Sequence, residues 1–502
     1  QSLRQWNTAC QGSAPLLGTF RFSMNIGPRG SLHSTDSHGR RAKGSGSAEL
    51  RVVTGSDDGS AIIWILKDGH KEWSLVYSTD KSANGHTAAI TSVDVSSTGD
   101  VLTTSADTTV KVWSDSGEYQ LTIPESQPSK LEDVNKLAEM QKGHHDFVNS
   151  GSWRKPIARQ TMEGQPQTEE ILTCSDDCTA AVWRLPRKVA AQAKKRDEYL
   201  GFEAVRAKDA GMYLLQDPAI GHTGKVTMAT FSPNGEQVLT CSEDRTCIIW
   251  STPLRTQATT EMPTRARNLR PKGMLVPRLS SFGGGRSSKE LQHKGPIWSA
   301  VWEPAAPGAA PSKILTASRD KTAKLWDIQG DTCRTFPTKC SDADLIDKDF
   351  CLGASFIQTK KLILTWSIDG TATTYDLSSG KKVSQITAHS GAVWKACTDK
   401  DQKWILTASH DGTAMVWNIA EQRVQYTLAK HTGMLWHASF SPDNNYVITC
   451  SEDKTSRIWS LNDIGRDGPK DQVLGDKKYQ KHNLAVTCAA WFDRTKMEHY
   501  KE

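Results

Sequence analysis

The sequence predicts an all-β protein in which one antiparallel unit recurs around a closed ring. A nine-residue pattern occurs eight times, an apolar strand-like segment precedes most copies, and the two chain ends hold complementary parts of one unit. A short sheet of this kind cannot bury both of its faces alone, so neighbouring units must bury them. The chain has 502 residues, 37% of them hydrophobic, which is enough to build such a core.

The repeated pattern is Ser-x-Asp-x-(Thr/Ser)-x-x-x-Trp, with Tyr at the end of one copy. It is typical of two short strands joined by a tight turn, because Asp and Gly favour such turns and β-branched and aromatic residues flank them. The copies are Ser56–Trp64, Ser105–Trp113, Ser175–Trp183, Ser242–Trp250, Ser318–Trp326, Ser367–Tyr375, Ser409–Trp417 and Ser451–Trp459.

One copy places Ser409, His410 and Asp411 side by side, the three residue types of a hydrolase triad. Strand alternation sends consecutive side chains to opposite faces, whereas a triad needs its base bonded to both partners. The other copies keep the Ser and the Asp but replace the His with various residues. We therefore interpret the pattern as structural.

A His, often preceded by Gly, comes before the apolar segment of most units, as in GHTAAITSVDV from Gly85. This His, the hairpin Asp and the terminal Trp resemble the WD-repeat family over about residues 50–491. The resemblance implies a β-propeller in which the Ser and Asp of each hairpin bond to the upstream His and to the Trp. The structural residues implied are His86, His222, His389, His431, Asp58, Asp107, Asp177, Asp244, Asp320, Asp369, Asp411 and Asp453.

The number of units predicts eight blades rather than the family's commoner seven. First strands are expected near 86–95, 144–153, 222–231, 293–302, 350–356, 389–397, 431–440 and 482–491. The hairpin at 52–64 has no first strand before it, and the strand at 483–491 has no hairpin after it. Pairing these two would close the ring over residues 50–492 and remove its open edges. The weakest unit is 345–377, which lacks the Gly-His and ends in Tyr375.

The propeller is interrupted by insertions at about 116–142, 184–220 and 255–290, and flanked by a basic Gly/Ser-rich extension (1–49) and a tail (493–502). Within the first two insertions, 129–141 and 188–209 are predicted helices. The third is rich in Pro, Gly, Ser and Arg, so we expect it to be unstructured or ordered only on a partner.

Several function classes lack support in the sequence. No run of about eighteen apolar residues predicts a membrane span, and no secretory signal pattern is present. The eleven cysteines have no zinc-site spacing; Cys174, Cys241 and Cys450 share a slot with alanines, which indicates reduced core thiols and an intracellular location. No phosphate loop, metal motif or nucleophile elbow is present, so we expect no catalysis, cofactor or metal.

In the WD-repeat family, partners often dock around the central channel, which two positions per unit line. Here one half of these positions is aromatic or apolar, and Trp is enriched where binding energy concentrates. We hypothesise a partner protein segment bound there; alternatively the indoles pack on one another and bind nothing. The candidate residues are Trp298, Trp394, Trp436, Leu352, Ile368, Arg319, His410 and Glu452.

The rival hypothesis is an RNA- or ribosome-associated propeller that uses its basic insertion. Residues 251–292 carry eight Lys/Arg against two Glu, and such a stretch can neutralise phosphates. The residues concerned are Arg265, Arg267, Arg270, Lys272 and Arg278. The interpretation we prefer is a monomeric, non-catalytic scaffold within a multiprotein complex; a propeller-type enzyme is the third alternative.

Overall fold

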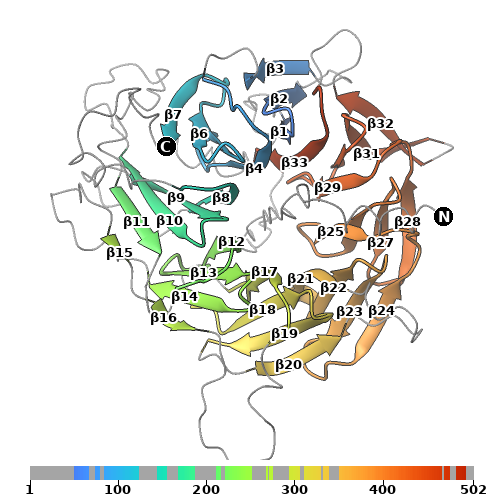
Figure 1. The fold of residues 1–502 in the computed structure, drawn as a ribbon. Coiled ribbons are helices and arrows are strands. Elements are labelled where there is room, and N and C mark those ends of the chain that lie inside the picture. The colour runs from blue at the N-terminus through green and yellow to red at the C-terminus, as the bar shows by residue number, and fades with distance from the viewer. Residues whose placement is uncertain are drawn as a thin grey trace, which may run out of the picture.

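In the computed structural model, the protein is built of antiparallel sheets arranged around a centre (Figure 1). One short 3-10 helix, η5 (Gln358–Lys360), is also present. The structure describes residues 50–66, 74–79, 84–123, 144–154, 168–186, 211–215, 221–251, 267–268, 271–274, 293–305, 310–328, 332–337, 350–465, 468–474 and 482–492. Among these residues there are eight sheets, here numbered I to VIII.

The first four sheets use described strands up to residue 274 together with the last described strand. Sheet I consists of β33 (Val486–Trp491), β1 (Leu50–Ser56), β2 (Ala61–Leu66) and β3 (Ser74–Ser78). Sheet II consists of β4 (Ile90–Val95), β5 (Val101–Ser105), β6 (Val110–Trp113) and β7 (Tyr119–Ile123). Sheet III consists of β8 (Val148–Trp153), β9 (Thr168–Ser175), β10 (Ala180–Pro186), β11 (Gly211–Leu215) and β15 (Arg267–Asn268). Sheet IV consists of β12 (Val226–Phe231), β13 (Gln237–Ser242), β14 (Cys247–Ser251) and β16 (Pro271–Met274).

The other four sheets follow one another along the C-terminal half. Sheet V consists of β17 (Ile297–Trp302), β18 (Lys313–Ser318), β19 (Thr322–Asp327) and β20 (Thr332–Pro337). Sheet VI consists of β21 (Cys351–Ile357), β22 (Leu362–Ser367), β23 (Ala372–Asp376) and β24 (Lys382–Ile386). Sheet VII consists of β25 (Val393–Thr398), β26 (Trp404–Ser409), β27 (Ala414–Asn418) and β28 (Arg423–Leu428). Sheet VIII consists of β29 (Leu435–Phe440), β30 (Tyr446–Ser451), β31 (Ser456–Gly465) and β32 (Gly468–Leu474).

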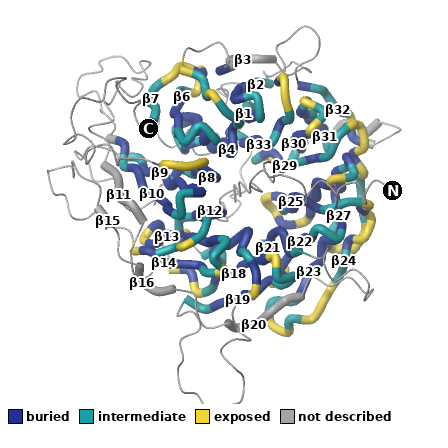
Figure 2. Tube along the Cα trace, viewed as in Figure 1, coloured by how far each residue is buried: buried dark blue, intermediate teal, exposed yellow. Residues whose placement is uncertain are grey.

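The inner strands are buried on both faces, and the outer strands are partly exposed (Figure 2). Every residue of β5 is buried, whereas β24 and β28 each expose several side chains. Inner strands such as β22 (LILTWS) therefore read as apolar and β-branched throughout rather than alternating. Burial from both sides requires a neighbouring sheet on each side.

The two ends of the described chain meet in sheet I. Strand β1 pairs antiparallel with β33 through Val52 and Trp491, Val53 and Ala490, and Thr54 and Ala489. The first strands contact one another in the order β33, β4, β8, β12, β17, β21, β25 and β29, and β29 contacts β33 in turn. In Figure 1 these strands lie innermost.

A backbone hydrogen bond recurs identically in every sheet. The residue after the conserved Ser of each hairpin donates its N–H to the carbonyl just before the first strand, at 2.8–3.0 Å. In sheet I this bond runs from Asp57 to Ala485, across the two ends of the chain, at 3.0 Å. The composite sheet thus has the same local geometry as the sheets made from one continuous segment.

Sheet VI differs from the other sheets by having a large side chain where they have a small one, and a glycine on the strand opposite. Trp366 occupies the slot that holds Cys174, Ala317 or Ala408 in other sheets, and it is fully buried. Its pairing partner is Gly353, where a Cβ would lie 2.1 Å from the indole ring. The glycine therefore makes room for the large side chain.

The basic insertion at 255–290 is not wholly unstructured, and that prediction was wrong for two of its segments. Strand β16 pairs with β14 as the outer strand of sheet IV, and β15 pairs parallel with β11 of sheet III. A segment with low strand propensity can form the outer strand of a sheet, because its backbone hydrogen-bonds to an edge strand that is already in place. The predicted helices at 129–141 and 188–209 lie outside the described residues.

Candidate functional site

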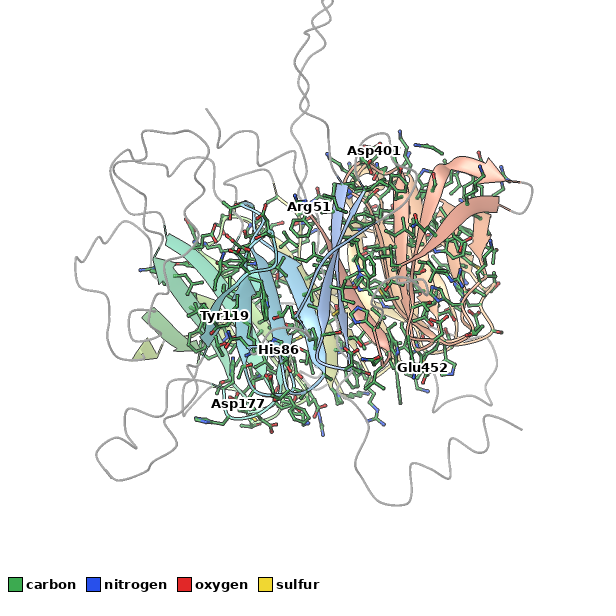
Figure 3. The ribbon with its side chains drawn as sticks, turned by 90° about the horizontal axis from the view of Figure 1, so that it is seen from above. Arg51, His86, Tyr119, Asp177, Asp401 and Glu452 are labelled. Carbon is green, nitrogen blue, oxygen red and sulfur yellow. The ribbon has the colours of Figure 1, made fainter. Side chains whose placement is uncertain are left out.

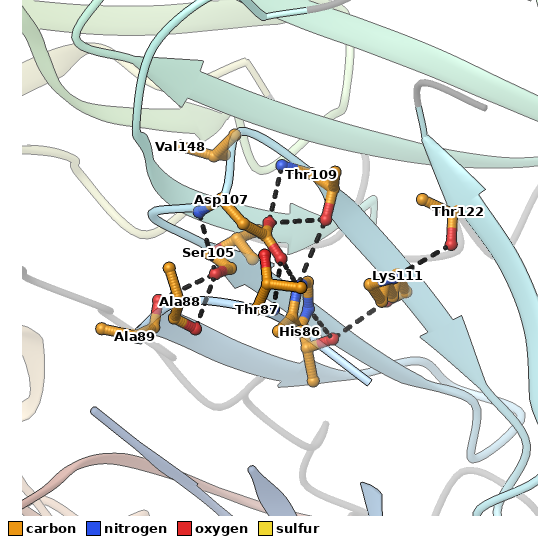
Figure 4. A network of polar contacts seen from close by, with 12 residues as sticks. His86, Thr87, Ala88, Ala89, Ser105, Asp107, Thr109, Lys111, Thr122 and Val148 are labelled. Carbon is orange, nitrogen blue, oxygen red and sulfur yellow. Dashed lines mark hydrogen bonds and ion pairs between the residues drawn. The ribbon is translucent and has the colours of Figure 1, made fainter. Parts of the chain in front are cut away.

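A network of His, Asp, Thr and Trp side chains connects the strands on one face of most sheets (Figure 4). In sheet II, His86 Nδ1 lies 2.8 Å from Asp107 Oδ2, and His86 Nε2 lies 2.8 Å from Thr103 Oγ1. The indole Nε1 of Trp113 donates to the same Thr103 oxygen at 3.0 Å. A neutral imidazole that donates from Nδ1 and accepts at Nε2 satisfies this chain of bonds.

The same His–Asp and His–Thr contacts occur in sheets III, IV, V, VII and VIII. The His–Asp distances between Nδ1 and Oδ2 are 3.1 Å for His144–Asp177, 2.9 Å for His222–Asp244, 2.8 Å for His293–Asp320, 3.0 Å for His389–Asp411 and 2.8 Å for His431–Asp453. In sheet I, His482 bonds Thr54 and Ser60, and its Nδ1 lies 3.7 Å from Asp58. All predicted structural histidines therefore lie in these networks.

The role expected for the hairpin Ser was wrong. Ser409 Oγ donates to the Gly391 carbonyl and accepts from the N–H of Asp411, and Trp indoles bond to threonine instead. The Ser side chain is too short to reach the imidazole, and the Thr two residues earlier does so. The missed residues are Thr54, Thr103, Thr173, Thr240, Thr316, Thr407 and Thr449. Their invariant spacing before the Ser was the available signal.

These networks strongly favour ionised aspartates. Burial would raise the pKa of Asp244, but hydrogen bonds from His222 and Thr246 and from the backbone N–H of Thr223 outweigh it and lower that pKa to about 2. Asp177 and Asp320 behave in the same way, each with a pKa of about 2. For His86 and His293, burial is the largest effect and lowers the pKa.

Sheet VI has no His at the network position. Its Thr and Asp are therefore left without the hydrogen bonds that the imidazole makes elsewhere. Among the described residues, neither Thr365 Oγ1 nor Asp369 Oδ2 has a hydrogen-bond partner, and both atoms are buried. In sheets II, III, IV, V, VII and VIII the equivalent atoms bond to the imidazole. Asp369 Oδ1 still accepts from the N–H and the hydroxyl of Thr371, so the turn itself is kept.

The second residue of the first strand in each sheet contacts the neighbouring sheet. In one half, which we call the polar sector, each side chain donates to the carbonyl at the start of the next first strand. The bonds are Thr487 to Ile90 at 3.2 Å, Thr91 to Val148 at 2.6 Å, Asn149 to Val226 at 2.9 Å and Thr227 to Ile297 at 2.7 Å. The first of these bonds joins the C-terminal strand to sheet II.

The other half, the aromatic sector, consists of Trp298, Leu352, Trp394 and Trp436 at the same positions, with Ile368 beside them. Trp298 and Trp394 are only 8% and 6% exposed, and Leu352 is 1% exposed. The Trp394 and Trp436 rings lie 5.5 Å apart, and all five residues pack in or against one core cluster that contains Trp366. The expectation that these indoles line the channel as exposed anchors is therefore wrong for Trp298 and Trp394, because packing between sheets covers them.

Half-buried and exposed side chains lie on the same face above this cluster. Trp436 and Ile368 are half-buried, and Arg319, His410 and Glu452 are exposed. The Arg319 guanidinium lies 4.7 Å from the Phe350 ring centre, and the His410 and Trp394 rings are 6.4 Å apart. The structure thus brings the predicted partner-binding residues together on sheets V to VIII. Figure 3 shows Glu452 and Asp177 on this face, which we call the His face, and Asp401 on the opposite one, the turn face.

Ser409, His410 and Asp411 do not assemble as a triad. Asp411 Oδ2 faces His389 at 3.0 Å, Ser409 bonds to backbone, and His410 lies exposed near Trp394.

A family model described as "WD domain, G-beta repeat" matches the chain at residues 73–114, 216–251, 285–327, 380–418 and 422–460. The chain is a WD-repeat protein. The matched segments include inner strands of sheets II, IV, V, VII and VIII. The inner strands of the composite sheet I, of sheet III and of sheet VI, which lacks the His, lie outside the matched segments.

Curated proteins with similar sequences include other WD-repeat proteins. The chain is 24% identical over 220 residues to a probable cytosolic iron-sulfur protein assembly protein 1 of Neurospora crassa, covering 40% of this chain and 44% of that protein. It is 23% identical to the ribosome biogenesis protein WDR12 homolog of Drosophila virilis, covering 55% and 48%, and 24% identical to the nuclear distribution protein PAC1 of Arthroderma otae, covering 67% and 58%. The matches thus span about half the length of these relatives.

Among solved structures, the computationally designed protein Ika8 has a similar fold, with a TM-score of 0.52 and 19% identity. The match covers 84% of this chain and 98% of that one, and at this identity it concerns the fold alone. Within the part of the WD-repeat chain that the structure describes, no helix is long and apolar enough to cross a membrane.

Cysteines of this WD-repeat chain lie in the core as predicted. Cys174, Cys241 and Cys450 are buried and free, and burial raises the pKa of Cys174 to about 12. Of the basic insertion, Arg267 lies in β15 and Lys272 in β16; Arg265, Arg270 and Arg278 lie outside the described residues.

We predict that Asp411→Ala destabilises the protein more than Asp369→Ala, by about 1–3 kcal/mol in the free energy of unfolding. Asp411 bonds to an imidazole and to the backbone N–H of Ser390, contacts that Asp369 lacks among the described residues. Urea denaturation of both variants followed by tryptophan fluorescence measures the difference. Equal losses would show that the imidazole contributes nothing to holding the strands.

We predict that stability falls as the pH drops from 7 to 5. In the unfolded chain His86 and His293 take up a proton near pH 6.5, whereas in the folded protein their lowered pKa moves that protonation to lower pH. His437 acts in the same direction, since burial and then Lys395 lower its pKa to about 3. Urea midpoints measured across this range should decline with pH, and less steeply in His437→Gln. A constant or rising midpoint contradicts the buried, neutral state of these residues.

Proposed function

We propose that this chain forms a closed propeller of eight WD-repeat blades and acts as a non-catalytic scaffold that binds other proteins. Each of the eight sheets corresponds to one blade, with β1 and β33 completing the ring. The cyclic contacts of the first strands and the antiparallel register of Val52–Thr54 with Ala489–Trp491 support this architecture. Relatives whose names place them in iron-sulfur protein assembly, ribosome biogenesis and nuclear distribution support a role in multiprotein complexes inside the cell.

The observation that carries the proposal is the mixed surface on the His face of sheets V to VIII. Trp436, Ile368 and Phe350 are half-buried there, which leaves apolar area for a partner, and Arg319, His410 and Glu452 surround it with exposed polar groups. An apolar centre with a polar rim is the usual composition of a protein interface. Because Trp298 and Trp394 are packed beneath, they support this surface rather than contact a partner.

The scaffold role follows from what the polar side chains do. The recurring imidazoles and hairpin carboxylates, which could otherwise serve as acids or bases, are bonded to one another and to threonines in most blades. Such satisfied networks make the blades rigid. A rigid surface loses little conformational entropy on binding, so weak contacts spread over several blades suffice for association.

The second candidate function is RNA association through the basic insertion, favoured by the relative named as a ribosome biogenesis protein. Arg265, Arg267, Arg270, Lys272 and Arg278 would neutralise phosphates in this case. Deleting 255–290 would then abolish RNA binding and leave protein partners in place.

We predict that Glu452→Lys reduces recovery of protein partners at least about fivefold, because reversing a rim charge opposes a complementary partner. The measurement is affinity isolation from cells with cross-linking and quantitative mass spectrometry, with partner cross-links expected around residues 319–452. Glu118→Lys makes the same change in an exposed turn of sheet II and serves as the control. Unchanged recovery with both Glu452→Lys and Trp436→Ala, in folded protein, would exclude this surface.

A further inference from the structure

Exposed lysines gather in three turns on the turn face of sheets VI and VII. Two lie between β21 and β22, two at the turn from β23 to β24, where Lys382 begins β24, and two between β25 and β26. These residues, which we call the lysine surface, are Lys360, Lys361, Lys381, Lys382, Lys400 and Lys403.

Hydrogen bonds join the turns into one surface. The N–H of Thr359 donates to Gln402 Oε1 at 2.8 Å, which connects the first turn of sheet VI to that of sheet VII. Within sheet VI, the N–H of Leu377 donates to the carbonyl of Lys361 at 2.8 Å, and that of Asp376 to the carbonyl of Lys381 at 2.9 Å. The lysines therefore project from backbone held in place by the fold.

Three carboxylates of these turns, Asp376, Asp399 and Asp401, offset only part of the charge of the six lysines. Asp376 accepts from the hydroxyls of Ser378 and Ser379, each at 2.6 Å. Asp399 is 3% exposed and accepts the backbone N–H groups of Lys403 and Trp404 at 2.7 Å.

Among the described residues, one lysine of this surface forms an ion pair with a carboxylate. Asp401 is exposed and lies 3.6 Å from Lys403. Glu421 forms an ion pair with Arg423 at 2.6 Å. Their charges cancel, so this pair does not change the net charge of the surface. Among the described residues, Lys360, Lys361, Lys381 and Lys400 make no ion pair with a carboxylate, so the surface has an excess of positive charge.

The chemistry of the surface fits phosphates. Its other exposed side chains include the hydroxyls of Thr359, Ser378 and Ser379, which also bond phosphate oxygens. The three turns contain no aromatic residue on which unpaired bases could stack. A fixed set of ammonium groups without stacking partners suits the regular backbone of a duplex.

We propose that the lysine surface binds the phosphate backbone of a double-stranded nucleic acid, without sequence specificity. It lies on the face opposite Glu452, as the position of Asp401 in Figure 3 shows. The protein-binding surface and the lysine surface would thus be occupied together, and the propeller would hold a nucleic-acid duplex beside a protein partner.

The test compares two double charge reversals in the full chain. Lys360→Glu with Lys400→Glu changes the lysine surface, and Lys294→Glu with Lys454→Glu makes the same charge change at exposed lysines of the His face. Binding of a labelled RNA duplex of about 20 base pairs and of a DNA duplex of the same sequence is measured by fluorescence anisotropy at about 50 and 200 mM salt. If the first variant does not fold, Lys381→Glu with Lys382→Glu replaces it.

We expect the lysine-surface variant to bind at least about tenfold more weakly than the unchanged protein and to lose about two units of its salt slope. The control should bind within about twofold of the unchanged protein. Tighter binding of one duplex identifies RNA or DNA as the source of the phosphates. Equal loss in both variants, no duplex binding at low salt, binding of phosphatidylserine vesicles only, or binding abolished by deleting 255–290 but not by the lysine changes would overturn the proposal.

Discussion

The pairing of β1 with β33 is the contact on which the arrangement of the other sheets depends. Each sheet has four strands, or five in sheet III, and buries both faces of its inner strands, so each needs a neighbour on either side. Sheets VIII and II obtain that neighbour only because the two ends of the described chain form sheet I together. Core residues from both ends, including Val52, Trp64 and Val486, pack with Ile448 of sheet VIII. The Thr487 hydroxyl reaches the Ile90 carbonyl on the other side.

Neighbouring sheets contact each other through two chemically different kinds of side chain. In the polar sector, hydroxyl and amide groups bond to carbonyls of the next sheet; in the aromatic sector, indoles and a leucine fill the same positions. Packing of large side chains demands matched volumes, which is why Trp366 requires Gly353 in sheet VI. In the aromatic sector Trp436 and Ile368 are half-buried. The same side chains on sheets V to VIII can therefore pack between sheets and contact a partner. On the opposite face, the turns of sheets VI and VII carry charge because no packing demand acts on them.

Much of the fold could be predicted from short-range pattern. The Ser and Asp positions locate each hairpin, and every first strand lies inside its predicted range or within a few residues of it, as β12 and β29 show. The Thr two residues before the Ser was missed although its spacing is constant, because threonine is common in strands and its presence there does not by itself indicate a polar network. The exposure of Trp394 could not be predicted either, since it depends on side chains from two neighbouring sheets. Strands β15 and β16 were missed because their pairing comes from edges already formed rather than from their own residues. The lysine surface was missed for a similar reason: its three turns are brought together by the fold alone.

The most direct measurement is a cross-link between the two ends. Gly55 pairs with Cys488, and a Cβ at residue 55 would lie 2.8 Å from the Cys488 sulfur, within reach of a disulfide once the Ile90 side chain, also 2.8 Å away, shifts. In Gly55→Cys, mild oxidation of the folded protein should link residues 55 and 488, as peptide mapping would show; Ser116→Cys, in an exposed turn of sheet II, should not link to Cys488. A folded Gly55→Cys variant whose new thiol stays free, or links elsewhere, would contradict the closed ring and the surfaces inferred from it.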